Sequence, residues 1–577
     1  MGFEQAAILA LLVGMLALFA IDRIRMELVA LGGLGLAVAL GLVGPAQAFA
    51  GFSSPAFVTV VEILLIVQVL GRSGILDPFA RRVSEVAGTE TAVLALLCIA
   101  TAGISVFMNN IGALALMIPV VTSVCRVSGL DSRRMLMPVS FAALLGGLCS
   151  VIGTPANLIV SGQLAAATGR GFAFFDFAWV GLPAAVAGIL AVVVWPRRVL
   201  GRDTAGRGRL PPQAFRTVIS EVVVPAGSPL VGRPVGEAGL AIHAVRRAGA
   251  HLLHQRPGTT IASGDTLLVE TGLLHLEALL AAGALALPGG ASPSGARQRV
   301  EAVIMPESTL VGSRVGTLEL LSCRGITVVA VAARTPRIEG SLADLRLSIG
   351  DVLYLEGDRA AIDEAIDEAE ILPLWPDPRD KAGDVRWTPV AAFACGIALA
   401  ALGLAPPELA FALVVLVLAA LGRLNLRQGL AELDWPILLM LATMIPLGSA
   451  VETTGAAAFL ADGLLSVLPS HDTLVVAAVM MTIALLITPF VNNASTALVL
   501  GPVAVGAAQA SGLPPEPLLL AVAVGASVDF LTPIGHHNNT VVMGIAGYRF
   551  SDFPRAGWPV TLVVAVAAIL ALWAWWT

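Results

Sequence analysis

Charged residues are scarce in this chain. They make up 13% of 577 residues, whereas ordinary soluble domains carry about 25%. Hydrophobic residues make up 57%, and the mean hydropathy is +0.87. This composition excludes an ordinary soluble protein and indicates a polytopic membrane protein.

Signatures of catalysis are absent as well. The sequence contains no GxxxxGK[ST], HExxH or GxSxG pattern. We therefore expect no enzyme and no cofactor, and an ion gradient is favoured over nucleotide hydrolysis as the energy source. No basic, aromatic-rich stretch points to a nucleic-acid partner. The five cysteines show no CxxC spacing, and those in apolar stretches are expected to be buried thiols.

Long apolar runs fill most of the remaining sequence, and they form two sets. The first set contains runs at about 4–21, 28–44 and 54–71, two arms at 91–107 and 110–125, a segment at 135–168 interrupted at Gly153-Thr154-Pro155, and a run at 177–195. The second contains runs at 388–404, 408–422 and 434–451, arms at 473–490 and 494–508, a segment at 517–546 interrupted at Thr532–Gly535, and a run at 556–576. The shared order predicts an internal repeat of about 5+5 spans, residues 1–200 and 388–577.

Each half carries two adjacent asparagines inside an apolar arm. They are Asn109-Asn110 in ISVFMNNIGALALMIPVV and Asn492-Asn493 in ITPFVNNASTALVLGPVA. Amides at membrane depth are costly unless something pairs with them. They could simply cap short helices or join neighbouring ones. Their duplication beside the two interruptions favours one shared polar site built from two related halves.

Arginines set the expected orientation through the positive-inside rule. They follow the first, third and last runs of the first half and the second run of the second half, whereas 452–472 has no Lys or Arg. This fits if each pair of arms is a re-entrant hairpin and each interrupted segment crosses once. The N-terminus is then outside, 200–387 is cytoplasmic, and the halves are inverted. Arms that crossed fully would place the arginines after residue 195 outside.

The interruptions predict ion sites. Broken-helix N-termini favour anions, and freed carbonyl or amide oxygens suit Na⁺. One cation site is expected at Asn110 and Gly153, and the other at Asn493, Asp529 and Thr532. An anion would lie between them. Its candidate ligands are Asn109, Asn110, Thr154, Pro155, Asn157, Asn492, Asn493, Thr532, Pro533, His536 and Asn538.

Each ionisable group beside the second interruption could have a functional or a structural role. Asp529 could hold a cation or carry a proton, or it could cap the next half-helix. His536 and His537 could donate to an anion or titrate, or they could make structural hydrogen bonds.

A polar insert between the halves is itself duplicated. PAGSPLVGRPVG (225–236) resembles PESTLVGSRVG (306–316), and SGDTLLVE (263–270) resembles IGDVLYLE (349–356). The Gly-Asp pairs predict hairpin turns before alternating strands. We expect a linker at 201–217, α+β modules at 218–284 and 300–370, and a flexible connection at 285–299.

Four motifs carry a family resemblance: FMNNIGALALMIP, LLGGLCSVIGTPANLIVSG, FVNNASTALVLGP and SVDFLTPIGHHNNTVVMGIAGYRFSDF. Through these motifs, residues of about 1–200 and 388–577 resemble the divalent-anion/sodium symporter family of the ion-transporter superfamily. The whole chain, with its insert, resembles the sulfate-transporter-like branch of that family. The insert is similar to two C-terminal subdomains of RCK (regulator of potassium conductance) proteins. The family's hairpin tips usually read Ser-Asn-Thr, so Asn110 and Asn493 keep the central amide while the flanking hydroxyls are replaced.

The resemblance implies an all-α polytopic protein of the elevator type with a cytoplasmic α+β insert. It also implies a homodimer in a bacterial inner (plasma) membrane that moves a small divalent anion, such as sulfate or a C4-dicarboxylate, with Na⁺ or H⁺. The insert would be a regulatory module that could bind a small ligand. Two alternatives stay open: an exchanger or efflux pump for another ion or oxyanion that uses Asp529 for protons, and a membrane sensor that signals through the insert. A channel is disfavoured.

Overall fold

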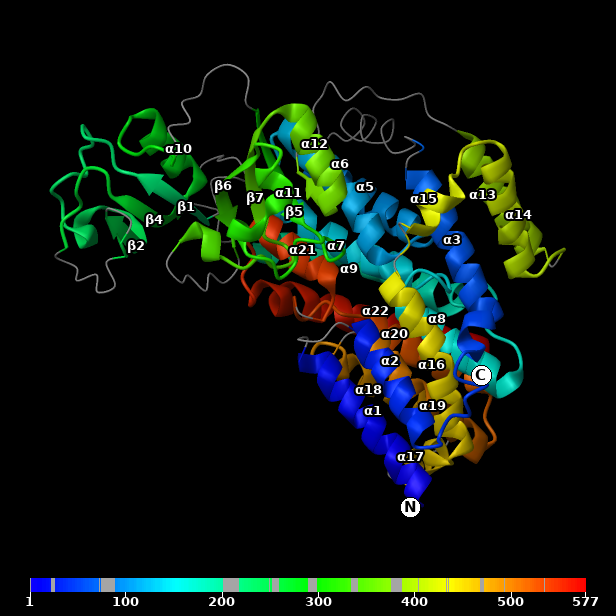
Figure 1. Cartoon of the computed structure of the whole chain (residues 1–577). Coiled ribbons are helices and arrows are strands. Elements are labelled where there is room, and N and C mark those ends of the chain that lie inside the picture. Colours follow the sequence, from blue (N-terminus) through cyan, green and yellow to red (C-terminus); the bar gives the residue numbers. More distant parts are fainter. Residues whose placement is uncertain are drawn as a thin grey trace.

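The computed structural model consists of a large helical part and a sheet on one side of it (Figure 1). It describes the chain apart from residues 1, 22–25, 72, 74–88, 201–216, 248–249, 252–258, 289–297, 334–340, 375–386, 403, 432, 434, 467, 469–471, 492, 534 and 577.

The helices of the first half follow the predicted apolar runs closely. They are α1 (Phe3–Ile21), α2 (Met26–Ala39), α3 (Pro55–Gly71), α5 (Glu90–Ser105), α6 (Asn110–Ser128), α7 (Arg133–Gly147), α8 (Pro155–Thr168) and α9 (Ala178–Leu200), with a 3-10 turn η1 at Ala50–Ser53. The predicted interruption of the 135–168 segment is the gap between α7 and α8.

The helices of the second half have the same order. They are α13 (Trp387–Ala401), α14 (Pro407–Ala420), α15 (Leu426–Ala431), α16 (Trp435–Thr453), α17 (Ala456–Leu465), α18 (Thr473–Ile487), α19 (Asn493–Ser511), α20 (Pro515–Ser527), α21 (His537–Ala546) and α22 (Asp552–Trp576). Only the short helices α15 and α17 have no counterpart among the predicted runs. The interruption of 517–546 is the gap between α20 and α21.

Polar caps explain where the helices around the interruptions begin. Asn109 Oδ1 accepts from Gly112 N at 2.7 Å and starts α6, and Thr154 Oγ1 accepts from Ala156 N at 3.2 Å and starts α8. Pro155 occupies the first turn of α8, where its missing N–H costs nothing. α8 and α21 end at left-handed glycines, Gly169 and Gly547.

The α5–α6 pair returns to the side from which it starts. Glu90 begins α5, and its Oε1 lies 3.4 Å from Nη1 of Arg134, in the first turn of α7. Because α7 follows directly on α6, both ends of the hairpin lie together. Two full antiparallel spans would also return to the starting side, so re-entry of this hairpin stays a prediction.

The last helices of the two halves, α9 and α22, pack along each other in opposite directions. At one end the rings of Trp179 and Trp575 are 4.2 Å apart. At the other end Trp195 Nε1 donates to Arg555 O at 3.1 Å. These two corresponding helices therefore run antiparallel, as an inverted repeat requires. Inversion of the whole repeat stays a prediction.

Helix length alone does not identify the spans. Among the described residues, three helices are long and apolar enough to cross a membrane, namely Ala178–Trp195, Asn493–Ser511 and Asp552–Trp576. A bent pair, Leu438–Val451 with Ala456–Gly463, adds a fourth if it is one span. Most other apolar helices have 10–17 residues. Hairpin arms and broken helices need to reach only part of the way, provided protein covers their ends.

The insert forms one eight-stranded sheet with the order β3-β2-β4-β1-β6-β7-β5-β8. Its strands are β1 (Thr217–Val223), β2 (Ala241–Arg247), β3 (Ala250–His251), β4 (Thr266–Gly272), β5 (Gln298–Ile304), β6 (Thr327–Ala332), β7 (Val352–Gly357) and β8 (Ile371–Pro373). Helices α10 (Leu273–Ala281), α11 (Glu319–Ser322) and α12 (Arg359–Ala369) and the 3-10 turns η3 (Val235–Glu237), η4 (Val315–Thr317) and η5 (Leu342–Asp344) complete it.

The duplicated motifs of the insert have matching places in this sheet. The order β2-β4-β1 recurs as β6-β7-β5. Gly264 and Gly350, both with positive φ, form turns directly before β4 and β7, as the Gly-Asp pairs predict. The two modules share the sheet, since β1 pairs with β6 at Ile219 and Val331.

Strand β7 departs from the predicted alternation between core and solvent, because all its residues are buried. Val352 and Tyr354 belong to the core that includes the membrane helices, whereas Leu353 and Leu355 belong to the insert's own core. β7 therefore separates two cores, since one face of the second module packs against the helices.

The docking of the second module involves α6 and α21. Thr122 Oγ1 in α6 donates to Leu374 O, just after β8, at 2.9 Å. On α21, Gly544 lies against the turn before β7, so closely that a Cβ there would be 1.7 Å from Gly350 O. Figure 1 shows α21 beside β5.

Two glycines let the last helices touch the interruptions directly. A Cβ on Gly181 of α9 would lie 2.0 Å from Leu148 O, and one on Gly557 of α22 would lie 2.1 Å from Phe530 O. Both neighbours are backbone atoms that cannot move aside. We predict that Gly181→Ala and Gly557→Ala each lower the free energy of unfolding by about 1–3 kcal/mol, the usual cost of overpacking.

Thermal unfolding of the purified protein in detergent measures this cost. Gly103→Ala on α5 is the matched control, because a Cβ at Gly103 meets nothing within 4 Å. Melting temperatures of the two variants equal to that of the control would contradict the packing described.

Candidate functional site

The tips of the two hairpins meet the interruptions of the opposite halves. Asn110 and Asn493 are the first residues of α6 and α19, with exposures of 2% and 7%. Asn493 Nδ2 donates to Thr154 Oγ1 at 3.1 Å. The Asn110 side-chain amide lies 3.5 Å from His536 Nε2. Since Thr154 and His536 are the N-caps of α8 and α21, each tip contacts the start of a half-helix from the other half.

The interruptions are held by asparagines one turn into the following helix. Asn157 Nδ2 donates to Gly147 O at 3.0 Å and to Ser150 O at 2.7 Å. In the other half, Asn539 Nδ2 donates to Asp529 O at 2.8 Å and to Thr532 O at 3.1 Å. Carbonyls freed by the breaks thereby gain partners.

A hydroxyl in each interruption ties it to the neighbouring hairpin. Ser150 Oγ donates to Val106 O at 2.5 Å, and Thr532 Oγ1 donates to Pro489 O at 3.0 Å. The same hydroxyls accept from Gly153 N at 3.1 Å and from Gly535 N at 3.2 Å. The two halves therefore contain one hydrogen-bonding framework twice.

The contact between Asn110 and His536 has a defined direction. His536 Nδ1 accepts from Asn538 N at 3.2 Å, so a neutral ring carries its proton on Nε2 and donates toward Asn110. Asn110 must then present its oxygen to His536 and turn its nitrogen away. In that orientation its nitrogen, with two hydrogens to donate, lies within hydrogen-bond distance of Gly153 O at 3.1 Å, Ala143 O at 2.9 Å and Ser105 Oγ at 2.9 Å.

Asp529 is fully buried, at 0% exposure, between α20 and α21. Neither carboxylate oxygen has a hydrogen-bond partner in the part of the chain that the structure describes. The carboxylate presses against Gly535, where a Cβ would lie 1.9 Å from Oδ2. Asp529 does not cap α21, since His536 does.

The other predicted residues take more varied places. Asn109 caps α6, and Asn538 Nδ2 donates to Asn110 O at 3.0 Å. Pro533 O accepts from Thr540 Oγ1 at 2.5 Å and faces α21 instead of the tips. Asn492 lies outside the described residues.

Sequence reasoning missed several contributors. Ser105 bonds Asn110, and Ser527 Oγ lies 3.5 Å from Thr154 Oγ1. Asn539 is the counterpart of Asn157 but was not among the candidates. An alignment of the two interruptions that matches Thr154 with His536 also matches Asn157 with Asn539, and it would have identified Asn539. Buried serines in apolar helices leave no comparable signal.

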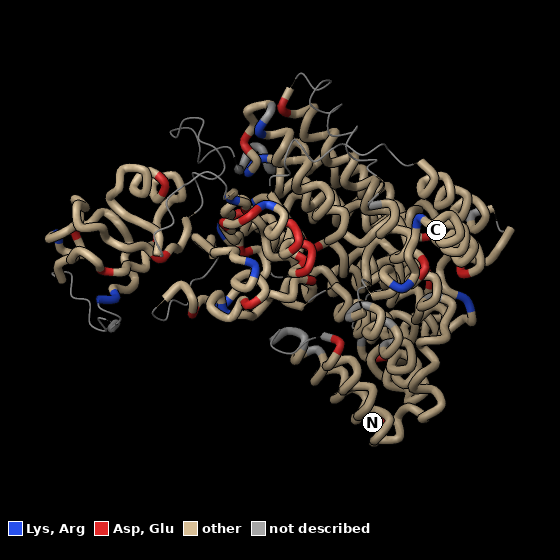
Figure 2. Tube along the Cα trace, turned by 45° about the horizontal axis from the view of Figure 1, so that its top comes forward, with Lys and Arg blue, Asp and Glu red and all other residues tan. Residues whose placement is uncertain are grey.

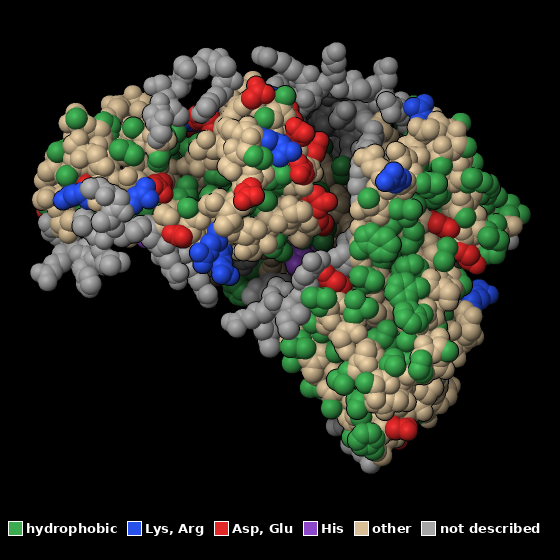
Figure 3. All heavy atoms as spheres, in the orientation of Figure 1, with side chains coloured by type: hydrophobic (Ala, Val, Ile, Leu, Met, Phe, Trp, Pro, Cys, Tyr) green, Lys and Arg blue, Asp and Glu red, His purple; other side chains and the backbone are tan. Residues whose placement is uncertain are grey.

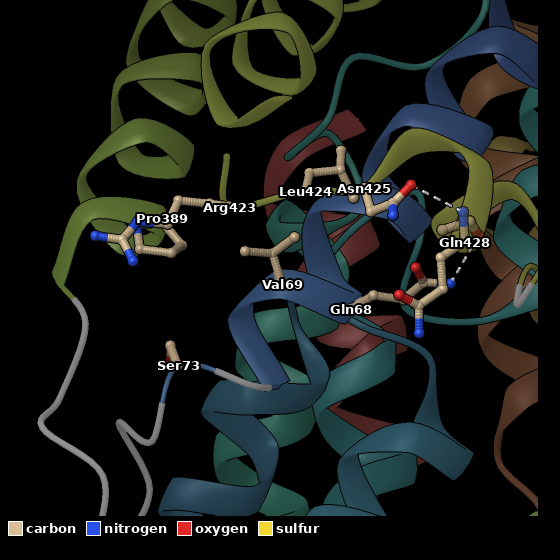
Figure 4. Close-up of a pocket in the computed structure, with 9 residues that line it drawn as sticks. Gln68, Val69, Ser73, Pro389, Arg423, Leu424, Asn425 and Gln428 are labelled. Carbon is tan, nitrogen blue, oxygen red and sulfur yellow. Dashed lines mark hydrogen bonds between the residues drawn. The ribbon is translucent and has the colours of Figure 1, made fainter. Parts of the chain in front are cut away.

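Neither of two cavities in the described part of the chain forms an anion-sized space between the hairpin tips. One cavity, of about 200 Å³, lies between α3, α13 and the α14–α15 turn, beside Gln68 and Arg423 (Figure 4). A cavity of about 30 Å³ adjoins Asn109 and Pro155, enough for about one water molecule. At the tips the polar groups close on one another. In the described residues no cluster of three or more His, Cys, Asp or Glu could hold a metal ion.

Several known proteins are similar to this chain, two of them over almost its full length. The Escherichia coli transporter YfbS is 28% identical over 99% of both chains. The Synechocystis transporter sll0640 is 27% identical over 97% of this chain and 95% of its own. Sodium/sulfate cotransporter 2 of Chlamydomonas reinhardtii is 26% identical over 55% of this chain and 39% of its own.

One solved structure aligns with the whole chain, the YdaH transporter of Alcanivorax borkumensis. It is 14% identical to this chain, with a TM-score of 0.43, and the alignment covers 98% of the YdaH chain.

The citrate transporter family, CitMHS, matches residues 16–525 and 470–577, which together span both helical halves. This match agrees with the anion/sodium symporter resemblance of the hairpin and interruption motifs. The chain therefore belongs to the citrate transporter family, a family of membrane transporters and not of enzymes.

Proposed function

We propose that this protein is a secondary active transporter that couples the movement of Na⁺ or H⁺ to that of a small divalent anion such as sulfate or a C4-dicarboxylate. The observation that carries the proposal is the contact of each hairpin tip with the half-helix start of the opposite half. The N-termini of α8 and α21 supply partial positive charge, and uncharged donors surround them. Relatives named as sodium/sulfate cotransporters support the same substrate class.

The donors at the tips suit an anion without carrying a full charge. Asn493 Nδ2 and His536 Nε2 are hydrogen-bond donors, and Thr154 offers a hydroxyl. In the closed arrangement they bind one another. An anion would take over these hydrogen bonds, so its entry requires the tips to part from the opposing caps. That exchange is the kind of local change that alternating access needs.

The first half has the oxygens that a sodium site requires. Gly153 O, Ala143 O and Ser105 Oγ converge on the Asn110 amide nitrogen. Backbone carbonyl and hydroxyl oxygens at a broken helix are suitable ligands for Na⁺. A sodium ion would replace the amide nitrogen, with the Asn110 oxygen turned toward the ion.

The sheet would lie in the cytoplasm of a bacterial cell. The described arginines of the helical part near the sheet include Arg126, Arg133, Arg134, Arg549 and Arg555, at helix ends on the side where α9 leads into the insert. Figure 2 shows Arg, Asp and Glu over the sheet and long uncharged stretches along many helices. Figure 3 shows apolar side chains covering much of the visible surface of the helical part. The positive-inside rule assigns this side to the cytoplasm of the inner membrane.

Transport would follow an elevator movement in a homodimer. The hairpins, the broken helices and α9 with α22 form the moving unit, because their contacts build the site. Helices α1–α3 and α13–α16 would form the scaffold and carry the dimer contact.

The insert would regulate this movement, for instance on binding a small ligand. Its second module contacts α6 and α21, the helices that start beside the site at Asn110 and His536. A ligand bound to the insert can bias transport only if it favours one arrangement of these helices over another.

The tip amides give the direct test of transport. We predict that Asn110→Ala and Asn493→Ala each reduce anion uptake on the order of tenfold or more, equivalent to a loss of about 1.4 kcal/mol or more. Uptake of labelled sulfate, succinate and citrate into proteoliposomes, with imposed Na⁺ or H⁺ gradients, measures this. Asn425→Ala, which removes only the cap of α15, is the matched control. Near wild-type uptake by both tip variants would remove the proposed site.

The contact of the insert is tested at Gly544. We predict that Gly544→Val separates the turn at Gly350 from α21, because a Cβ there would overlap Gly350 O. Hydrogen exchange should rise at 348–351, and the initial rate of uptake should change by about twofold or more, a shift of roughly 0.4 kcal/mol.

The matched control is Gly463→Val on α17, where a Cβ meets nothing within 4 Å. Raised exchange at the turn with unchanged uptake would show that the insert does not act on transport through this contact.

A further inference from the structure

One position distinguishes the two otherwise matching interruptions. The carbonyls bonded by Asn157 and Asn539 belong to Gly147 and Ser150 in one half and to Asp529 and Thr532 in the other. Asp529 thus takes the place of Gly147. The single hydrogen of a glycine is thus replaced by a side chain that carries a carboxyl group.

The space around these two positions is filled differently. A Cβ at Gly147 would lie 2.3 Å from the Asn110 amide, which therefore occupies that space in the first half. In the second half the Asp529 carboxyl lies against Gly535, the counterpart of Gly153. The first half thus has a neutral amide at its interruption, whereas the second has an ionisable group.

The surroundings of Asp529 supply no compensating charge. Its neighbouring helices α8, α18 and α19 contain no charged residue among those described. The titratable groups on its other neighbours, α7, α21 and α22, and in the preceding turn are Arg133, Arg134, His536, His537, Asp552 and Arg555. None of them donates a hydrogen bond to either carboxylate oxygen. An isolated carboxylate anion in such a place is costly, so the group requires a proton or a bound cation.

A proton fits this place better than a sodium ion. The carbonyls of Asp529 and Thr532 already accept from Asn539, and the Thr532 hydroxyl bonds Pro489 O and Gly535 N. Among the described residues, these oxygens are occupied by bonds that hold the interruption itself, and the backbone of Gly535 fills the space beside the carboxylate, where a Cβ would lie 1.9 Å from Oδ2. A proton needs no such space.

We propose that Asp529 is the proton-binding site of this transporter, so that one coupling ion of the second half is H⁺. The inference rests on the proposed cation-coupled function and names its ion at this site. On release, the O–H bond of the carboxyl breaks, its electron pair stays on the carboxylate, and the proton passes to water in the compartment that the site faces. On loading, the same oxygen takes a proton from the other compartment.

Infrared spectroscopy of the purified full-length protein tests the proton directly. Wild-type protein at neutral pH should show the C=O band of a protonated carboxyl, and this band should persist when Na⁺ is added. Asp529→Asn should lack it, and Asp462→Asn, a change on the exposed face of α17, should retain it. Asp529→Ser and ¹³C-aspartate labelling of the wild type serve the same purpose if Asp529→Asn does not fold. A carboxyl that is ionised at neutral pH, or that loses its proton when Na⁺ is added, would overturn the proposal.

Proteoliposomes separate this inference from the wider function. With labelled sulfate, succinate or citrate, Asp529→Asn should lose accumulation driven by a pH gradient but keep exchange of internal for external anion. Accumulation equal to that of wild type would overturn the role of Asp529. If the wild type moves none of the three anions, the substrate proposal fails, while the infrared result still decides whether Asp529 holds a proton.

Discussion

Backbone carbonyls released by broken helices need partners, and much of this site depends on how the chain provides them. A helix interrupted inside an apolar interior exposes several carbonyls that water cannot reach, and each unpaired group costs free energy comparable to a lost hydrogen bond. Here a single asparagine bridges two carbonyls across each gap, Asn157 in one half and Asn539 in the other. The gaps are thereby held in a fixed shape, and the caps Thr154 and His536 are presented to the hairpin tips. Without those bridges the positions of the caps would not be defined.

The sequence predicted the helices well, for physical reasons that can be named. Apolar runs ended by Pro, Gly and Asn mark helix ends strongly, so the interruptions at Thr154 and Thr532 were predicted close to where they occur. Duplicated motifs marked the tips and the interruptions as related elements, but they grouped each tip with the interruption of its own half, whereas Asn493 contacts Thr154 and Asn110 contacts His536 of the opposite half. What sequence could not decide was which of Asn538 and Asn539 bridges the gap, because they are adjacent amides in one polar stretch, His536–Thr540. The answer depends on the side of α21 that faces the gap, where Asn539 reaches Thr532 O and Asn538 reaches Asn110 O.

The insert shows a different limit. Its repeated turns and strands could be predicted, because Gly-Asp turns are a local signal. The fusion of both modules into one sheet is a long-range pairing and leaves no local trace. The burial of β7 on both faces was likewise not predicted, since it depends on helices far away in the sequence. This docking brings Gly350 onto α21 and Leu374 onto α6, and it joins the insert to the helices of the site rather than to α1 or α13.

The two interruptions share a framework but differ in one side chain, so features that shape the interruption can be distinguished from features that serve another role. The bridges, hydroxyl ties and close-packed glycines recur in both halves, which indicates that they serve the shape of the interruption. Asp529 and Gly147 can differ without loss of the bridges, because the bridging asparagines bond to backbone carbonyls and not to side chains. A buried carboxyl with unpaired oxygens contributes nothing to such a framework and costs stability there. Its presence in only one of two matched positions is best understood as a functional difference between the halves.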